Sequence, residues 1–196
     1  MPTKADQILA GVVSGLGLDP TDPLAIYANI NEIVEQLALL NAAETISVST
    51  TGTITERLCE YGLKVAAPDS YRKLAPAWKW LGDFYVQGAP FNTLISVKSF
   101  KAKERLLSSG TGNLLSPTLG YGLFNDPKEW SQKRVASYVF RAFFGIYMPY
   151  KLLTTLSVEA KEQKNINGMP FLRCIEDFIS DIRGAMNGNL LDPRKL

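Results

Sequence analysis

The fold is decided by the stretch GDFYVQGAPFNTLISVK, which covers residues 82–98. Two runs in it, 82–86 and 92–98, are rich in aromatic and β-branched residues, and glycine and proline separate them. Such runs on either side of turn residues are typical of two antiparallel strands joined by a turn. Asp83 on the first strand and Lys98 on the second can then point to the same face and meet at one end of the hairpin.

Patterns on both sides of this hairpin predict an alternation of helices and strands. Before it, we expect a long helix at 23–43 that starts at Asp22-Pro23, a shorter helix at about 53–61 that ends at Gly62, and a short strand at 63–67. After it, we expect a long loop at 106–126, a helix at about 126–136, a buried strand at 138–148 and a helix at 170–186. The three tryptophans, Trp78, Trp80 and Trp130, are expected in the core.

The composition is that of one globular domain over residues 1–196, because 46% of the residues are hydrophobic and 20% are charged. We place a catalytic core at about 52–148, an N-terminal helical segment at 1–45 and C-terminal helices at 150–186. No apolar run approaches the roughly 18 residues that cross a bilayer, and the first residues do not resemble a signal peptide. We therefore expect a cytoplasmic protein without a membrane partner.

The absence of histidine limits the chemistry of the chain. It excludes Ser-His-Asp and Cys-His nucleophile systems, zinc sites built on histidine, and nucleases with a histidine base. The two cysteines, Cys59 and Cys174, lie far apart in segments of helical pattern, which favours core positions over a disulfide or a zinc cluster. Any reaction must therefore use carboxylates, lysine, hydroxyl groups or a hard metal ion.

The near-neutral net charge of +2 hides a strong asymmetry along the chain. Residues 1–63 carry two basic and eight acidic residues, whereas residues 64–105 carry eight basic and three acidic ones. Residues 127–151 add five basic residues against one acidic residue. Such a distribution can present a positive face to a polyanion, although it is also compatible with an ordinary solvated surface.

Glu56 on the helix before the hairpin can approach the end where Asp83 and Lys98 meet. Two carboxylates suit Mg²⁺, which keeps several waters and accepts phosphate oxygens in the rest of its shell. A lysine beside them can orient or deprotonate an attacking water. Each residue also has a purely structural interpretation, since Asp83 can begin a strand, Lys98 can face solvent and Glu56 can cap a first turn.

These residues resemble the PD-(D/E)xK nucleases over roughly 52–148. Gly82-Asp83 is similar to the metal-binding Asp position, with glycine where the family has proline, and Ser96-Val97-Lys98 is similar to the (D/E)xK element, with serine in place of the acid. The sequence GTITER at 52–57 is similar to the helix motif that supplies a further carboxylate. The resemblance implies an α/β fold with an αβββαβ core, in which a central mixed β-sheet is flanked by helices.

The resemblance also implies a function and a role for each residue. We expect a type II restriction endonuclease that acts as a homodimer and cleaves double-stranded DNA with Mg²⁺. Asp83 and Glu56 would hold the metal, Lys98 would position the water, and Ser96 would support the site through its backbone or hydroxyl group. Glu60 is the alternative to Glu56, and Asp69, which follows a proline, is the alternative to Asp83.

Two further groups are candidates for DNA contacts. Lys101, Lys103 and Arg105 could bind phosphates, and Ser108, Ser109, Thr111 and Asn113 could reach base edges. Two other functions remain open: a Holliday-junction resolvase or repair nuclease of the same superfamily, and a DNA-binding module that cleaves nothing. The serine at position 96 is the feature that favours the last.

Overall fold

The computed structural model describes residues 2–43, 46–88, 91–100, 106, 116–141 and 143–187. Six strands form one mixed sheet in the order β1-β2-β3-β4-β5-β6. They are β1 (Tyr71–Lys73), β2 (Phe84–Val86), β3 (Thr93–Lys98), β4 (Thr118–Gly122), β5 (Phe143–Met148) and β6 (Leu172–Cys174). The α helices are α1 (Lys4–Gly15), α2 (Pro23–Ala28), α3 (Ile30–Ala42), α4 (Val48–Ala66), α6 (Gln132–Phe140), α7 (Tyr150–Thr155), α8 (Val158–Lys161) and α9 (Phe178–Met186). The 3₁₀ helices are η1 (Pro76–Trp78), η3 (Pro127–Trp130) and η4 (Ile175–Asp177).

The antiparallel hairpin predicted from the sequence is present as β2 and β3. Phe84 pairs with Ile95, and Val86 pairs with Thr93. β1 adds to the hairpin in antiparallel orientation, whereas β3, β4, β5 and β6 are parallel to one another. The expected class, an α/β fold with a central mixed sheet flanked by helices, is confirmed.

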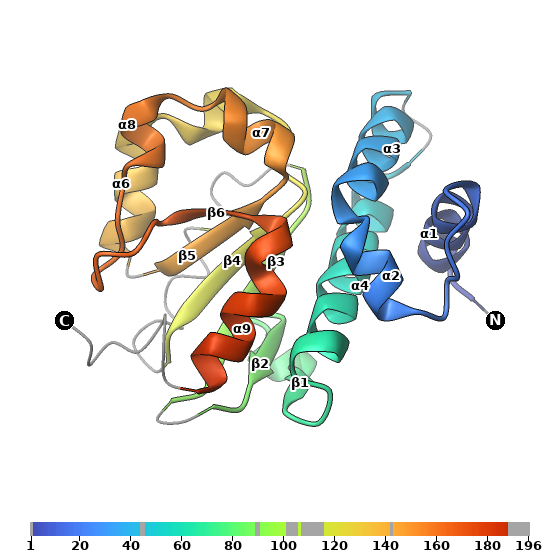
Figure 1. Cartoon of the computed structure of the whole chain (residues 1–196), viewed down its shortest axis with the longest axis horizontal. Helices are drawn as coiled ribbons and strands as arrows, with labels where there is room; N and C mark the ends of the chain where they lie inside the picture. The colour runs from blue at the N-terminus through green and yellow to red at the C-terminus, as the bar shows by residue number, and fades with distance from the viewer. Residues whose placement is uncertain are drawn as a thin grey trace.

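Helices cover both faces of the sheet (Figure 1). One core contains the apolar faces of α1 to α4 and α9, together with Phe84, Ile95 and Tyr121 of the strands. The other core contains residues of α6, α7 and α8 packed against β5 and β6. In Figure 1, α9 crosses in front of the sheet and α1, α3 and α4 lie on the right. No described helix is long and apolar enough to span a membrane.

The predicted helix at 23–43 is in fact two helices, α2 and α3, and the prediction of one long helix was wrong. The predicted start is confirmed, because Oδ1 of Asp22 accepts hydrogen bonds from the N–H groups of Leu24 and Ala25. The break lies at Asn29, whose φ of −111° is outside helical values and whose side chain donates to the carbonyl of Ala25 at 2.8 Å. An apolar pattern with helical spacing cannot distinguish a continuous helix from two that share a buried face.

The helix around Glu56 is longer than predicted, and the strand expected at 63–67 does not exist. α4 runs from Val48 to Ala66 without a stop at Gly62. Gly62 instead allows close packing, since a Cβ there would lie 2.6 Å from Cε2 of Tyr27 and 3.0 Å from Cδ1 of Phe178. Glycine is common at the ends of helices, but Gly62 lies inside α4, where the missing side chain lets two aromatic rings approach the helix.

The loop expected at 106–126 was wrong for its later part, where Thr118–Gly122 form the fully buried strand β4. The two glycines in β4, Gly120 and Gly122, are packing positions. A Cβ on Gly122 would lie 2.7 Å from the carbonyl oxygen of Lys98, and one on Gly120 would lie 3.1 Å from Cγ1 of Ile146.

Two boundaries further along the chain also differ from the prediction. The region expected to be a strand from 138 begins with the end of α6, and β5 starts only at Phe143. The region expected to be helical from 170 begins with the short strand β6, and η4 and then α9 follow it.

Candidate active site

Asp83 is built into the end of the β2–β3 hairpin. Its backbone N–H donates to the carbonyl of Ile95 at 2.8 Å, and its Oδ2 accepts the N–H of Val97 at 2.7 Å. The residue before it must be small, because a Cβ on Gly82 would lie 2.9 Å from the carbonyl oxygen of Ile95. Proline carries such a Cβ, which gives a physical reason for glycine at this position.

Lys98 ends β3 beside Asp83. Its Nζ lies 3.7 Å from Oδ2 of Asp83 and donates to Oγ of Ser96 at 2.8 Å and to the carbonyl of Val97 at 2.9 Å. The Asp83 and Lys98 side chains are only 13% and 15% exposed, so water screens their interaction weakly. The structure therefore brings Asp83, Ser96 and Lys98 together, as the hairpin pattern predicted.

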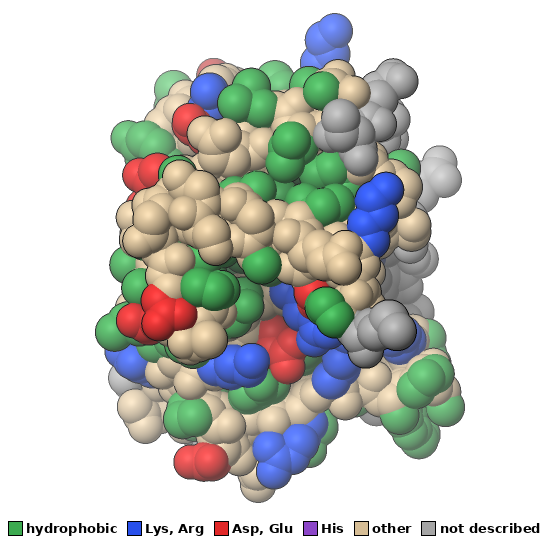
Figure 2. All heavy atoms as spheres, turned by 90° about the vertical axis from the view of Figure 1, so that its right-hand side faces the viewer, with side chains coloured by type: hydrophobic (Ala, Val, Ile, Leu, Met, Phe, Trp, Pro, Cys, Tyr) green, Lys and Arg blue, Asp and Glu red, His purple; other side chains and the backbone are tan. Residues whose placement is uncertain are grey.

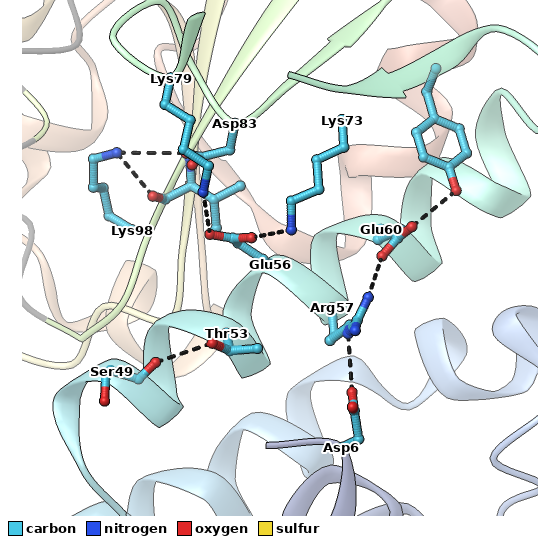
Figure 3. A network of polar contacts seen from close by, with 12 residues as sticks. Asp6, Ser49, Thr53, Glu56, Arg57, Glu60, Lys73, Lys79, Asp83 and Lys98 are labelled. Carbon is cyan, nitrogen blue, oxygen red and sulfur yellow. Dashed lines mark hydrogen bonds and ion pairs between the residues drawn. The ribbon is translucent and has the colours of Figure 1, made fainter. Parts of the chain in front are cut away.

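Glu56 projects from α4 toward the same region (Figure 3). Its two carboxylate oxygens face two ammonium groups: Nζ of Lys73 is 2.6 Å from Oε2, and Nζ of Lys79 is 3.7 Å from Oε1. Lys73 ends β1, and Lys79 follows η1 in the connection from β1 to β2. Neither lysine was predicted to belong to the site, because their approach to Glu56 depends on where β1 joins the sheet.

The two alternative acids have other surroundings. Glu60 accepts hydrogen bonds from Arg57 at 3.2 Å and from the hydroxyl of Tyr71 at 3.3 Å, and Arg57 also pairs with Asp6 at 3.1 Å. This chain of contacts joins α1, α4 and β1 (Figure 3). Asp69 lies exposed in the turn before β1, and its carboxylate contacts no side chain that the structure describes. Of the four acids, Asp83 is the one that lies beside Lys98, and the assignment of the ligands stays a prediction.

Cys59, on α4, is buried next to the acidic residues. Burial raises the pKa of its thiol well above the ordinary value, and the negative charges of Asp83, Glu60 and Glu56 raise that pKa further. The thiol is therefore protonated at neutral pH.

The donor set fits a divalent ion that needs few protein ligands. Oδ2 of Asp83 accepts the hydrogen bond from Val97, and Oδ1 accepts none from the described residues. No group of three or more cysteine, aspartate and glutamate side chains forms a metal cluster in the described part of the chain. Mg²⁺ is nevertheless commonly held by one or two carboxylates, with water and substrate phosphate completing the shell. Asp83 and Glu56 would supply those carboxylates.

Lysine side chains contact the acids of the candidate site. On the face shown in Figure 2, acidic side chains lie in a hollow with lysine and arginine side chains around them. Trp78 and Trp80 flank Lys79 and are 55% and 52% exposed, so the expectation that they belong to the core was wrong. Trp130 is buried in the core as expected. The predicted DNA contacts Lys101, Lys103, Arg105, Ser108, Ser109, Thr111 and Asn113 lie outside the described residues.

Comparisons with known proteins support the fold. The chain is similar to a solved structure described as "Restriction endonuclease PspGI-substrate DNA complex", with a TM-score of 0.61 and 14% sequence identity. The similarity covers 95% of this chain and 94% of that chain. No protein-family model matches the sequence, and a search of curated proteins gave no significant match. At this identity the similarity establishes the fold, and the chain has a restriction-endonuclease-like fold.

Proposed function

We propose that this protein is a Mg²⁺-dependent endonuclease that hydrolyses phosphodiester bonds of double-stranded DNA. The observation that carries the proposal is the position of Lys98, whose Nζ is held 3.7 Å from Oδ2 of Asp83 at the open end of a hairpin, near Glu56. A restriction-endonuclease-like fold supports it, since the similar structure is a complex of such an enzyme with DNA.

The proposed reaction is attack of water on phosphorus, with cleavage of one P–O ester bond. A bound Mg²⁺ supplies charge neutralisation at the phosphate and lowers the pKa of water. Asp83 and Glu56 hold the ion. Lys98 orients the attacking water and stabilises negative charge on the phosphoryl oxygens, and Ser96 and the Val97 carbonyl direct its ammonium group. Ser96 thus acts by positioning Lys98, which is a role that serine can fulfil without replacing an acid.

The finer assignment is a type II restriction endonuclease that acts as a homodimer. A two-fold assembly presents one site to each strand of a palindromic sequence, so both strands are cut within one complex. Each copy of this chain carries one set of Asp83, Glu56 and Lys98, which is what such an arrangement needs.

Plasmid cleavage tests the function. Parent protein with Mg²⁺ should convert supercoiled plasmid to discrete fragments, whereas Asp83→Asn and Lys98→Ala should cleave at least about 100-fold more slowly. Asp69→Asn is the matched control and should cleave like the parent. Asp69 is an exposed acid just before β1, and its carboxylate forms no hydrogen bond or ion pair with the described residues. If Asp83→Asn stays within about tenfold of the parent while Asp69→Asn loses activity, Asp69 is the ligand.

The same assay distinguishes the other functions. Cuts confined to branched substrates would identify a junction resolvase or repair nuclease. DNA binding without any cleavage, over a range of divalent metals, would identify a DNA-binding module. The latter is the alternative that Ser96 favours, since the position normally occupied by a second acid is a hydroxyl group.

A further inference from the structure

The connection between β1 and β2 carries two large aromatic side chains in solvent. We call residues 74–81 the tryptophan arm; it contains η1, Trp78, Lys79 and Trp80. Single exposed hydrophobic residues are common on protein surfaces. Here two exposed indole rings lie on either side of a lysine in the sequence, which combines aromatic surface with a positive charge. Neither ring contributes to the described hydrophobic cores, so packing does not account for them.

The tryptophan arm has a defined backbone that is joined to the proposed site. The N–H of Leu74 donates to the carbonyl of Asp83 at 2.9 Å, which closes the base of the arm at the metal-ligand position. Within the arm, the N–H of Trp78 donates to Ala75 at 2.8 Å and that of Leu81 donates to Trp78 at 2.9 Å. Turn hydrogen bonds therefore define the backbone that carries the two tryptophans.

The arm also lies next to Glu56. Nζ of Lys79 is 3.7 Å from Oε1 of Glu56, and Lys73, which precedes the arm, contacts the other oxygen (Figure 3). DNA bound with its scissile phosphate beside Asp83 and Lys98 would therefore lie next to the arm, whose base is hydrogen-bonded to Asp83. Lys73 and Lys79 outnumber the one acid that both contact, so this part of the surface attracts a polyanion.

We propose that the tryptophan arm is a DNA-contacting surface that flanks the proposed catalytic site. Lys79 contacts a backbone phosphate, and the rings of Trp78 and Trp80 pack on deoxyribose and base edges next to the scissile phosphate. The combination favours nucleic acid over an acidic protein, because every nucleotide of a duplex offers a phosphate charge together with an apolar sugar surface. The location beside the scissile phosphate rests on the proposed function, whereas DNA contact by the arm can be measured without cleavage.

Tryptophan fluorescence gives a direct readout, since the chain has three tryptophans and Trp130 is only 1% exposed. The parent protein is titrated in EDTA with a fluorescein-labelled duplex of about 25 base pairs, a length chosen to exceed the footprint of one such domain. Tryptophan emission and fluorescein anisotropy are recorded together. We expect DNA to quench the emission and the Trp78→Ala/Trp80→Ala double variant to bind at least about tenfold more weakly.

Two more variants test whether weaker binding comes from the loss of the tryptophan rings of the arm and whether Lys79 contacts a phosphate. Phe140→Ala is the control, because Phe140 is a solvent-exposed aromatic at the end of α6, and α6 packs on β5, three strands away from β2. It should bind like the parent. Lys79→Ala should lower the slope of log K against log salt by about one, as expected for the loss of one phosphate contact.

The outcomes for the arm and for catalysis are distinct. The proposal for the tryptophan arm would be overturned if the parent bound DNA with unchanged tryptophan emission and the double variant bound as tightly as the parent. The proposed nuclease activity would not be affected by that result. A failure of the parent to bind DNA would also overturn the proposal for the arm. If DNA quenched the tryptophan emission of the parent and the double variant bound more weakly, but the parent never cleaved DNA, the proposal for the arm would stand and the proposed nuclease activity would be refuted.

Discussion

The carboxylate of Glu56 contacts two lysines, and a bound metal ion would compete with both. Lys73 and Lys79 neutralise the carboxylate, and a cation at the same oxygens has to displace their ammonium groups. Both lysines are roughly half exposed, so their ion pairs with Glu56 are weak enough to exchange. A lysine displaced from Glu56 is then available to a DNA phosphate, which would couple metal binding to DNA binding.

Exchange of Glu56 for glutamine tests its role as a ligand. Glu56→Gln should raise the Mg²⁺ concentration for half-maximal cleavage by about tenfold or more, because the site loses one of two carboxylates. Ser96→Ala should move that midpoint by less than about twofold but lower the maximal rate, since the hydroxyl holds Lys98 rather than the metal. Cleavage rates against Mg²⁺ concentration for the parent and both variants provide the measurement. A large midpoint shift for Ser96→Ala and none for Glu56→Gln would transfer the second ligand to another acid, first of all Glu60.

At the scale of elements, the packing of α4 against its neighbours depends on Gly62. Alanine there improves helix propensity by about 1 kcal/mol, but its methyl group meets the rings of Tyr27 and Phe178 at 2.6 and 3.0 Å. The steric cost of the methyl group should exceed the gain in helix propensity. We therefore expect Gly62→Ala to lower the free energy of unfolding by about 1–2 kcal/mol. Gly52→Ala is the control, since a Cβ at this position in the same helix meets no atom within 4 Å. Urea unfolding of the three proteins compares them, and a Gly62→Ala protein as stable as Gly52→Ala would contradict the packing role.

A buried charge network joins α9 to β5 and β6. Both carboxylate oxygens of Asp181 accept hydrogen bonds from Arg173, and Oδ2 also accepts the hydroxyl of Tyr147 at 2.8 Å. Asp181→Ala would leave the guanidinium of Arg173 without its carboxylate in a mostly buried position. The expected loss is about 3 kcal/mol of unfolding free energy, against less than about 0.5 kcal/mol for the exposed Asp69→Ala. Calorimetry or urea unfolding gives both values, and equal losses would show that the network contributes nothing specific.

The elements that the sequence predicted well are those whose signals are local. The β2–β3 hairpin follows from two strand-like runs around a turn, and that register alone places Asp83 near Lys98. Glycine misled the prediction at Gly62 and Gly122, because both serve close packing with distant residues rather than turns. The two lysines at Glu56 and the exposure of the tryptophan arm depend on where β1 sits in the sheet, which no local pattern encodes.

At the scale of the whole molecule, stability should fall on the alkaline side of neutral pH. The chain has no histidine, so no side chain has an ordinary pKa between about 5 and 8. Burial raises the pKa values of Tyr27, Tyr121, Tyr147 and Cys59 above their ordinary values. These groups release protons first in the unfolded chain, so their contribution to stability is complete below about pH 9 and falls as the pH rises further.

Urea unfolding at a series of pH values measures this dependence. We expect a nearly constant free energy of unfolding between about pH 6 and pH 8, and a decline above about pH 9 to 10. The Tyr147→Phe variant provides the control, because it removes one buried phenol and should have a shallower decline. Stability that is unchanged at about pH 10.5 would show that the phenols are not kept protonated by the fold.

The way the sheet ends has a consequence for aggregation. β1 and β6 are the outer strands, and each is only three residues long. An outer strand has unpaired backbone groups that can recruit a strand from another molecule, and short, charged strands resist this. Two copies joined at β1 would bring Arg72 and Lys73 of one copy beside the same basic residues of the other, and like charges would oppose the union. The basic residues of β1 therefore protect the protein from uncontrolled pairing of this edge strand with another copy.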